Sequence, residues 1–235
     1  VDGTLQRLDI MLVRRGLAAS RDRARDLIIS GAVTVNGQLV LKPAKACAVA
    51  SVIDIKHGGN PWVSRAGLKL AGAITSFQGL NVTGCVALDI GASTGGFTDV
   101  LLAHGADHVV AVDVGRRQLH ERLTTDRRVT VLDSFNARYL TASILPYAPD
   151  LIVCDASFIS LQKLLPAALG LAQGGARLVA LIKPQFELGK GLVGKGGIVR
   201  DTALHREVVA GVVDWLETEM YWHVLQTMPS PITGQ

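Results

Sequence analysis

The order of apolar and polar positions in the first quarter of the chain predicts a small unit of helices and short strands. Apolar residues at helical spacing precede Gly16, and a second helical pattern follows Ser20. Ser20 is a favourable N-cap because its hydroxyl accepts a backbone N–H of the first turn, and Gly16 suits a helix end because glycine adopts positive φ freely. Two alternating segments flank Asn36-Gly37, which favours a hairpin turn, and a further strand is expected over residues 50–55. The expected order is ααβββ.

The pattern changes from residue 82 onward to an alternation of strands and helices. Apolar strands are expected at residues 86–90, 108–112, 129–132, 150–154, 177–182 and 222–227. The clearest helices between and after them span residues 95–104 and 202–218. Strands that are apolar on both faces are typical of a parallel sheet covered by helices on both sides. The sequence therefore predicts a Rossmann-like α/β domain over residues 64–235, joined to a small α+β domain over residues 1–56 by a linker at residues 57–63, where glycine, asparagine and proline break the pattern.

The composition is that of a folded chain, with 49% apolar and 19% charged residues. No run of about 18 uncharged apolar residues is present, so no membrane-spanning helix is expected. The first residues contain no apolar segment typical of a signal peptide. The spacing of Cys47, Cys85 and Cys154 fits neither a zinc site nor a disulfide framework. We therefore expect a cytoplasmic protein with reduced cysteines, no metal and no membrane partner.

The positive charge of the chain is concentrated near its start. Residues 1–62 contain nine Lys or Arg and five Asp or Glu, which accounts for the whole formal net charge of +4. Arg21 and Arg25 lie one helical turn apart, and Arg14 and Arg15 end the preceding helix. Guanidinium groups placed in this way can contact phosphates in a bidentate manner, which favours a nucleic-acid partner. The alternative is a solvated face of mixed charge, because acidic residues alternate with these arginines.

Several short motifs recur at fixed spacings in this basic unit: Arg7-Leu8-Asp9, Gly16-Leu17, Ser20-Arg21, Val33-x-Val35-Asn36-Gly37 and Lys42-Pro43. The combination resembles the S4 RNA-binding domain over residues 5–56. The resemblance implies a structured RNA, recognised mainly through its shape and phosphates. The basic residues expected to contact RNA are Arg7, Arg14, Arg15, Arg21, Arg25 and Lys42.

A glycine-rich turn follows the first strand of the second domain and reads Asp89-Ile90-Gly91-Ala92-Ser93-Thr94-Gly95-Gly96-Phe97-Thr98. The turn lacks the spacing that binds nicotinamide dinucleotides. Asp89 can face the amino-acid end of a zwitterionic ligand, and Asp113, at the end of the next strand, can accept both hydroxyls of a ribose. One amino-acid tail and one ribose without a pyrophosphate suit S-adenosylmethionine. The expected cofactor-binding residues are Asp89, Gly91, Ala92, Ser93, Thr94, Gly95, Gly96, Phe97, Asp113, Val114 and, near the adenine, Asp133.

Three residues are candidates for the chemistry. A ribose 2′-hydroxyl loses its proton only with help, and a lysine can act as the base or stabilise the alkoxide. Lys183 follows an apolar strand and precedes a proline, a setting expected to depress its pKa. Asp155 ends the neighbouring strand and can orient the ammonium, while Lys69 can complete a cluster of two cations and one anion. The alternatives are that Lys183 is an ordinary surface residue and that Asp155 only caps a helix.

Motifs across the second domain extend this interpretation. They read Ser64-Arg65-x-Gly67-x-Lys69-Leu70, Asp89 to Thr98, Asp155-x-Ser157-Phe158-Ile159-Ser160-Leu161, Ile182-Lys183-Pro184-Gln185-Phe186-Glu187 and Gly194-Lys195-Gly196-Gly197-Ile198-Val199-Arg200-Asp201. Together with the basic unit they resemble the haemolysin A (TlyA) family, whose members join an S4 domain to a class I methyltransferase domain of the FtsJ type.

The resemblance to this family implies a specific reaction and partner. It implies an enzyme that methylates cytidine 2′-hydroxyls in ribosomal RNA with S-adenosylmethionine, and ribosomal RNA or ribosomal subunits as partners. It also implies a Lys-Asp-Lys-Glu tetrad, whose first three members correspond to Lys69, Asp155 and Lys183. A monomer is expected.

The chain departs from the family pattern at three places. The last tetrad member follows a Ser-Pro-Ile-x-Gly stretch in the family, and here the sequence stops at Gln235, directly after that stretch, so an incomplete C-terminal end is expected. Arg116-Arg117 replace aromatic or glycine residues of the family. Asp133-Ser134-Phe135-Asn136 replace Glu-Arg-Thr-Asn on the adenine side.

Two other classes of function are kept as alternatives. The first is a pore-forming cytolysin, as the historical family name indicates, although the sequence contains no long apolar span and no strongly basic amphipathic helix that would support it. The second is a non-catalytic RNA-binding protein with a relic cofactor domain, which the absence of the last tetrad glutamate favours.

Overall fold

The chain divides into two compact units, residues 1–68 and 69–235, in a computed structural model. The structure describes residues 5–29, 32–40, 42–55, 60–188, 194, 199 and 201–232. Residues 57–59 of the predicted linker lie outside the described residues, and the predicted domain boundaries stay a prediction. None of the helices in the described part of the chain has the length and apolar character needed to cross a bilayer.

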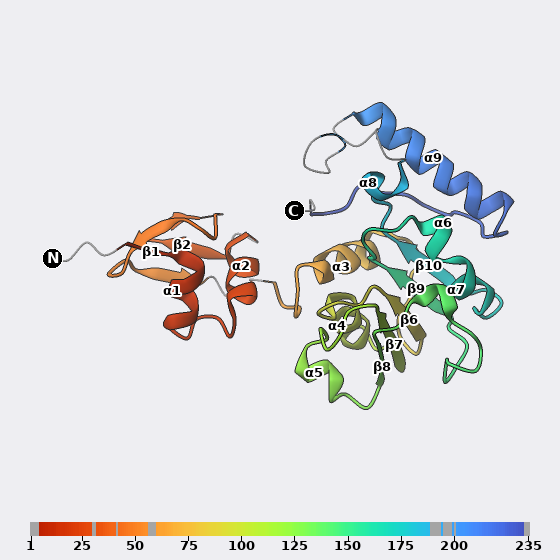
Figure 1. Cartoon of the computed structure of the whole chain (residues 1–235), viewed down its shortest axis with the longest axis horizontal. Coiled ribbons are helices and arrows are strands. Elements are labelled where there is room, and N and C mark those ends of the chain that lie inside the picture. The colour runs from red at the N-terminus through yellow and green to blue at the C-terminus, as the bar shows by residue number, and fades with distance from the viewer. Residues whose placement is uncertain are drawn as a thin grey trace. The chain divides into compact units, whose positions relative to one another are not determined.

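The first unit combines two helices with short antiparallel strands (Figure 1). Its elements are β1 (Leu5–Arg7), α1 (Leu8–Arg14), α2 (Arg21–Ile29), β2 (Val33–Val35), β3 (Gln38–Leu39), β4 (Ala46–Ala48) and β5 (Ile53–Ile55). Strand β2 pairs with β3 and β5, and β1 pairs with β4. Asn36 and Gly37 have φ of 50° and 77°, as the predicted hairpin requires. The helices and the hairpin agree with the sequence pattern, whereas β1 and β4 were not predicted.

The core of the first unit forms between the two helices and the sheet, and it includes Leu8, Leu12 and Ile28. One carboxylate, that of Asp9, is fully buried beside this core. It accepts from Arg7 Nη2 at 2.9 Å and from Arg21 Nη2 at 3.2 Å. The hydrogen bond from Arg7 lowers the pKa of Asp9 to about 2, against the opposing effect of burial. This network fastens the start of α1 to the start of α2.

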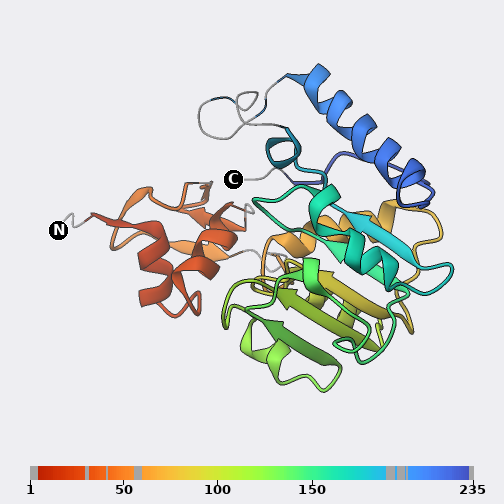
Figure 2. The ribbon, with the colours of Figure 1, turned by 45° about the vertical axis from the view of Figure 1, so that its right-hand side comes forward.

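The second unit contains a five-stranded parallel sheet (Figure 2). Its strands are β6 (Val86–Ile90), β7 (His108–Asp113), β8 (Val129–Asp133), β9 (Leu151–Cys154) and β10 (Arg177–Ala180), arranged in the order β10-β9-β6-β7-β8. The central strands are buried along nearly their whole length, which explains their continuous apolar sequence. The sequence therefore predicted the parallel sheet of the α/β fold correctly.

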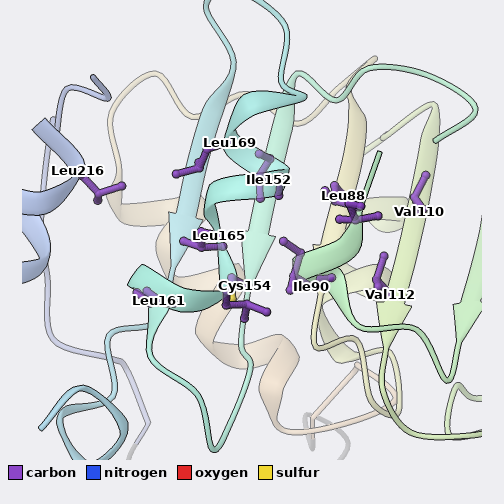
Figure 3. Packing of buried hydrophobic residues seen from close by; sticks show 14 of the residues in the cluster. Leu88, Ile90, Val110, Val112, Ile152, Cys154, Leu161, Leu165, Leu169 and Leu216 are labelled. Carbon is purple, nitrogen blue, oxygen red and sulfur yellow. The ribbon is translucent and has the colours of Figure 1, made fainter. Parts of the chain in front are cut away.

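Helices cover both faces of this sheet. The helices described from residue 66 onward are α3 (Ala66–Ser76), α4 (Gly96–Ala103), α5 (Glu121–Thr124), α6 (Leu161–Leu164), α7 (Pro166–Gly170), α8 (Pro184–Glu187) and α9 (Thr202–Thr218), with a 3-10 turn, η1 (Ala137–Tyr139). On one face, Leu161, Leu165 and Leu169 pack against alternate strand residues such as Leu88 and Ile152 (Figure 3). Helix α4 packs against β6 and β7 with side chains outside that cluster, so it covers the other face.

The predicted strand over residues 222–227 is wrong, since this segment has no regular structure. Tyr221 has a φ of 58°, and the amide of Trp222 donates to the carbonyl of Leu216 at 2.8 Å, which closes the end of α9. Trp222 and Val224 nevertheless pack against the main core. Two alternate side chains of this segment are thus partly buried although the segment has no strand partner. Strand β10 also ends at Ala180, two residues earlier than expected.

We predict that Asp9→Asn lowers the free energy of unfolding of the first unit by about 1–3 kcal/mol, because two guanidinium groups lose the negative charge and one of the two acceptor oxygens of their buried partner. The loss should shrink as the pH falls from about 4 toward about 2, because a carboxylate with a lowered pKa stabilises the fold only while it is ionised. Amide hydrogen exchange of α1 and α2 in the full chain measures this free energy of unfolding. The exposed Asp22→Asn on α2 is the control, and equal effects of the two substitutions would contradict the prediction.

Candidate active site

The predicted site residues of the second unit gather at one edge of the sheet. Lys183 comes shortly after β10, Asp155 directly follows β9, Asp89 lies near the end of β6, and Asp113 and Asp133 end β7 and β8. All five strands are parallel, so their carboxyl ends share this edge, where open α/β sheets bind ligands. The register pairs Asp113 directly with Asp133 and places Asp89 beside Val153, two residues before Asp155.

Two lysines flank one carboxylate at this edge. Lys69 Nζ, from α3, lies 3.1 Å and 2.8 Å from the two carboxylate oxygens of Asp155. Lys183 Nζ lies 2.7 Å from Oδ1 of the same residue. The three side chains are only 11–18% exposed. The structure thus assembles the cluster of two cations and one anion that the sequence indicated, and neither Lys183 as an ordinary surface residue nor Asp155 as a mere helix cap describes it.

The ammonium of Lys183 is held from several directions. Besides the carboxylate, it donates to the carbonyls of Asp155 at 3.0 Å and Ala156 at 2.8 Å, and to Oγ of Ser157 at 3.0 Å. An ammonium has three N–H groups, and four oxygens surround this one. The position of Nζ is therefore fixed by the loop after β9. Such a cluster carries one net positive charge and can stabilise a developing oxyanion or, once Lys183 is neutral, accept a proton.

The glycine-rich turn after β6 lies against the same loop. Gly91 has a φ of 78°, and a Cβ added there would lie 2.8 Å from Cα of Ala156. Only glycine allows this approach of the two backbones. The turn also bonds to the next strand, because the amide of Ser93, itself at a φ of 47°, donates to Asp113 Oδ2 at 2.8 Å. Glycine at this position therefore sets the distance between the predicted cofactor loop and the lysine cluster.

The other predicted cofactor residues of this turn differ in exposure. Ala92 and Phe97 are buried, with 7% and 3% of their surface exposed, so their side chains serve packing. Gly95, at a φ of 92°, precedes α4, and Gly96 is its first residue. Ser93 and Thr94 are exposed at the tip of the turn. Contacts of these residues with a cofactor stay a prediction.

Asp89 is a fully buried carboxylate with one oxygen left unsatisfied. Its Oδ2 accepts from Oγ1 of Thr98 at 2.6 Å, while Oδ1 has no hydrogen-bond partner in the described part of the protein. Burial raises the pKa of Asp89 to about 7, and the charges of Asp155 and Asp113 act in the same direction. An unpartnered buried acceptor costs free energy, so Oδ1 is a natural acceptor for a cationic donor of a ligand.

The carboxylate of Asp113 is oriented by two backbone amides. Oδ1 accepts from the amide of Gly115 at 2.7 Å and Oδ2 from that of Ser93. Each oxygen keeps a second lone pair for a hydroxyl donor. The neighbouring residue Val114 is 71% exposed and presents an apolar surface next to this carboxylate. Asp133 Oδ2 accepts from the amide of Arg117 at 2.9 Å, which joins the turns after β7 and β8.

The structure adds residues to which the sequence assigned no role. Phe158 is 90% exposed and has a φ of 66°, which is rare for a bulky side chain. The centroid of its ring lies 5.1 Å from the centroid of the Phe186 ring. Thr98 and Ser157 complete the contacts of Asp89 and Lys183. All four belong to the quoted motifs, which was the only available signal in the sequence.

The basic residues of the first unit fall into two groups. Arg7 and Arg21 pair with Asp9, and Arg15 donates to the carbonyl of Ser51 at 2.8 Å, so these three have structural contacts. The side chains of Arg14, Arg25 and Lys42 are exposed. Binding of RNA by all six stays a prediction. Across the described residues, no group of three His, Cys, Asp or Glu side chains could hold a metal ion.

Comparisons with known proteins identify both parts of the chain. The family model of FtsJ-like methyltransferases matches residues 62–235, and that of the S4 domain matches residues 6–53. The 16S/23S rRNA (cytidine-2'-O)-methyltransferase TlyA of Mycobacterium tuberculosis is 47% identical over 97% of this chain and 85% of its own length. Hemolysin A of Brachyspira hyodysenteriae is 40% identical over 97% of this chain and 94% of its own length.

A solved structure supports the same relationship. This structure is of a protein from Streptococcus thermophilus that is named as a candidate hemolysin. Its sequence is 38% identical to this chain, and the two structures superpose with a TM-score of 0.68. The match covers 91% of this chain and 78% of the other chain. The predicted fold class and the predicted resemblance to the haemolysin A (TlyA) family are both confirmed. The chain belongs to the FtsJ-like methyltransferase family, in the group with an S4 domain that includes TlyA and Hemolysin A.

Proposed function

We propose that this chain is a ribosomal RNA 2′-O-methyltransferase that uses S-adenosylmethionine and acts on a cytidine ribose. The observation that carries the proposal is the cluster of Lys69, Asp155 and Lys183 beside the glycine-rich turn. The name of the relative TlyA, which specifies cytidine 2′-O-methylation of 16S and 23S rRNA, supports the choice of substrate. A ribosomal RNA substrate places the reaction in the cytoplasm.

The residues at this edge of the sheet fit S-adenosylmethionine. Oδ1 of Asp89, which has no partner among the described residues, would accept from its amino group, and the oriented carboxylate of Asp113 would accept from its ribose hydroxyls. Val114 and Asp133, on the adjoining turns, would face the adenine. When bound, S-adenosylmethionine supplies a methyl group on a sulfonium, which is open to attack by a nucleophile.

The lysine cluster prepares the sugar hydroxyl for that attack. Lys183, in its neutral form, accepts the proton of the 2′-hydroxyl at Nζ and thereby generates the nucleophilic oxygen. Asp155 keeps Nζ at one place, because its carboxylate bonds to both lysines at once. The ammonium group of Lys69, beside the reacting oxygen, stabilises its developing negative charge. Each of the three residues therefore acts on the same proton or charge.

Two further features support RNA as the substrate. The exposed ring of Phe158, next to Ser157 and its bond to Lys183, offers a surface on which a nucleobase can stack, an interaction worth about 1–3 kcal/mol. The S4 domain presents the exposed basic groups of Arg14, Arg25 and Lys42 to phosphates. The first unit would thus supply affinity and register, and the second unit the chemistry.

Membrane lysis is a second candidate function, favoured by the name of the relative Hemolysin A. A methyltransferase site with three coupled charges has no part in lysis, whereas it accounts directly for methyl transfer. Leakage of liposomes induced by the pure protein separates the two functions. A non-catalytic RNA-binding role is tested by the turnover experiment described next.

We predict that Lys183→Ala lowers the rate of ribosomal RNA methylation by at least about 100-fold, because the group that takes the proton is removed. The affinity for S-adenosylmethionine should stay nearly unchanged, since the hydrogen bonds of Lys183 in the described part of the chain go to the loop after β9 and not to the predicted cofactor-binding residues. Transfer of a radiolabelled methyl group to ribosomal subunits and calorimetry measure the two quantities. Lys163→Ala, an exposed lysine on α6, is the control; turnover by Lys183→Ala would reject Lys183 as the base.

We predict that S-adenosylmethionine binds more tightly as the pH rises from 5.5 to 7, by up to about tenfold per unit. Asp89 is largely protonated at the lower pH because its pKa is raised to about 7, and a cationic amino group favours the ionised form. The amino group of the cofactor remains charged in this range. Calorimetry at several pH values in this range measures the affinity for S-adenosylmethionine. Asp89→Asn should bind the cofactor weakly and without pH dependence. Asp107→Asn, which changes an exposed aspartate, should behave as the native chain.

We predict that Arg14→Ala and Arg25→Ala each weaken binding to ribosomal RNA and reduce the slope of log affinity against log salt by about 0.7–0.9, one phosphate contact each. Filter binding at several salt concentrations measures this slope. Arg127→Ala changes an exposed arginine just before β8, at the opposite edge of the sheet from the lysine cluster, and should leave the slope unchanged. An unchanged slope in both S4 variants would contradict the phosphate-binding role.

A further inference from the structure

Two segments of the second unit carry most of the lysine cluster. The β9 loop, residues 155–160, supplies Asp155, and the α8 segment, residues 183–188, begins with Lys183. The two segments are far apart in sequence and belong to different strand ends. Their mutual position therefore decides where the proton-accepting nitrogen lies relative to the carboxylate that holds it.

Three kinds of contact run along the α8 segment, two to the β9 loop and one to Leu161, the residue that follows this loop. At the start, Lys183 Nζ donates to the carbonyls of the β9 loop. In the middle, the rings of Phe158 and Phe186 lie 5.1 Å apart. At the far end, Glu187 Oε1 accepts from the backbone amide of Leu161 at 2.9 Å. The first contact belongs to the proposed reaction, the second is between rings at the surface, and the third has no role in the mechanism above.

The bond to Leu161 replaces an ordinary helix cap. Leu161 is the first residue of α6, so its amide has no partner within the helix. Ser160 occupies the N-cap position, yet its side chain makes no capping hydrogen bond. The side chain of Leu161 is 3% exposed and belongs to the main core, so this amide is a fixed anchor point. Glu187 takes the place of the cap from another segment of the chain.

We propose that Glu187 is a positioning residue for the methyl-transfer reaction. Its carboxylate fastens the end of the α8 segment to the start of α6 and thereby holds Lys183 and Phe158 at their places in the site. In the described contacts Glu187 does not touch Lys69, Asp155 or Lys183, so it acts through the two segments. The proposal rests on the function proposed above.

The chemistry of the bond identifies the variants that test it. Glu187 is half-buried, and burial raises its pKa, while the bond from Leu161 opposes that rise. The contact needs only an acceptor oxygen, which an amide supplies without a charge. Glu187→Gln therefore keeps the contact and Glu187→Ala removes it. Gln185→Ala is the matched control, because Gln185 lies on the same short helix.

The first experiment measures kcat and KM for methylation of ribosomal RNA together with the affinity for S-adenosylmethionine. Glu187→Ala is expected to lower kcat about tenfold or more, since small displacements of reacting groups cost rate steeply. KM, cofactor affinity and melting temperature should stay close to those of the native chain. Glu187→Gln should retain kcat within about threefold, and Gln185→Ala should match the native chain.

The second measurement does not depend on activity. Hydrogen exchange at the Leu161 amide should be faster in Glu187→Ala than in the native chain, and should be close to native in Glu187→Gln and Gln185→Ala. An unchanged exchange rate in Glu187→Ala overturns the proposal, whether or not the chain methylates ribosomal RNA. So does an unchanged kcat, an equal loss in the Ala and Gln variants, or a loss of kcat that only follows a lower melting temperature. Absence of methylation by the native chain instead overturns the proposed function.

Discussion

The site depends on the placement of one carboxylate between two lysines. Asp155 bonds to Lys69 and Lys183 with distances of 2.7–3.1 Å in a region where the side chains are mostly buried. Two ammonium groups so close would repel each other strongly where water is largely excluded, so the carboxylate is the condition for their coexistence. The three charged side chains come from three elements, since Asp155 follows β9, Lys183 follows β10 and Lys69 lies on α3. The charges meet because the fold brings the ends of these elements together.

The second constraint is the cost of the buried Asp89. A carboxylate with no exposed surface, one oxygen of which has no partner in the part of the chain that the structure describes, destabilises the free protein by about 1–3 kcal/mol. Apolar packing offsets this cost, because Asp89 belongs to β6, the central strand of the sheet. The neighbouring residues Leu88 and Ile90 of this strand are buried in the main core on the other face. A ligand that supplies the missing donor recovers that energy, so the fold itself favours a cationic ligand at this place.

Arginines of the first unit illustrate how one residue type serves two purposes. Arg7 and Arg21 neutralise the buried Asp9 and remain about half exposed, while Arg15 holds the carbonyl of Ser51. The motif of the S4 domain therefore encodes stability as well as charge. Three arginines of this unit are thus anchored to the fold, so their side chains have already lost part of their conformational entropy in the free protein.

Much of the fold and of the site followed from the sequence alone, because the signals are local. Continuous apolar runs determined the parallel strands, and polar residues at strand ends marked one edge of the sheet, as Asp113 and Asp155 show. Only the tertiary structure decided what depends on packing between distant segments. Glu187 caps a helix it does not belong to, and Trp222 and Val224 pack against the main core from a segment that does not join the sheet. A repeating pattern predicts which side chains are buried. The hydrogen-bond partner of each backbone group and the ion-pair partner of each charged side chain are determined only when all segments pack together.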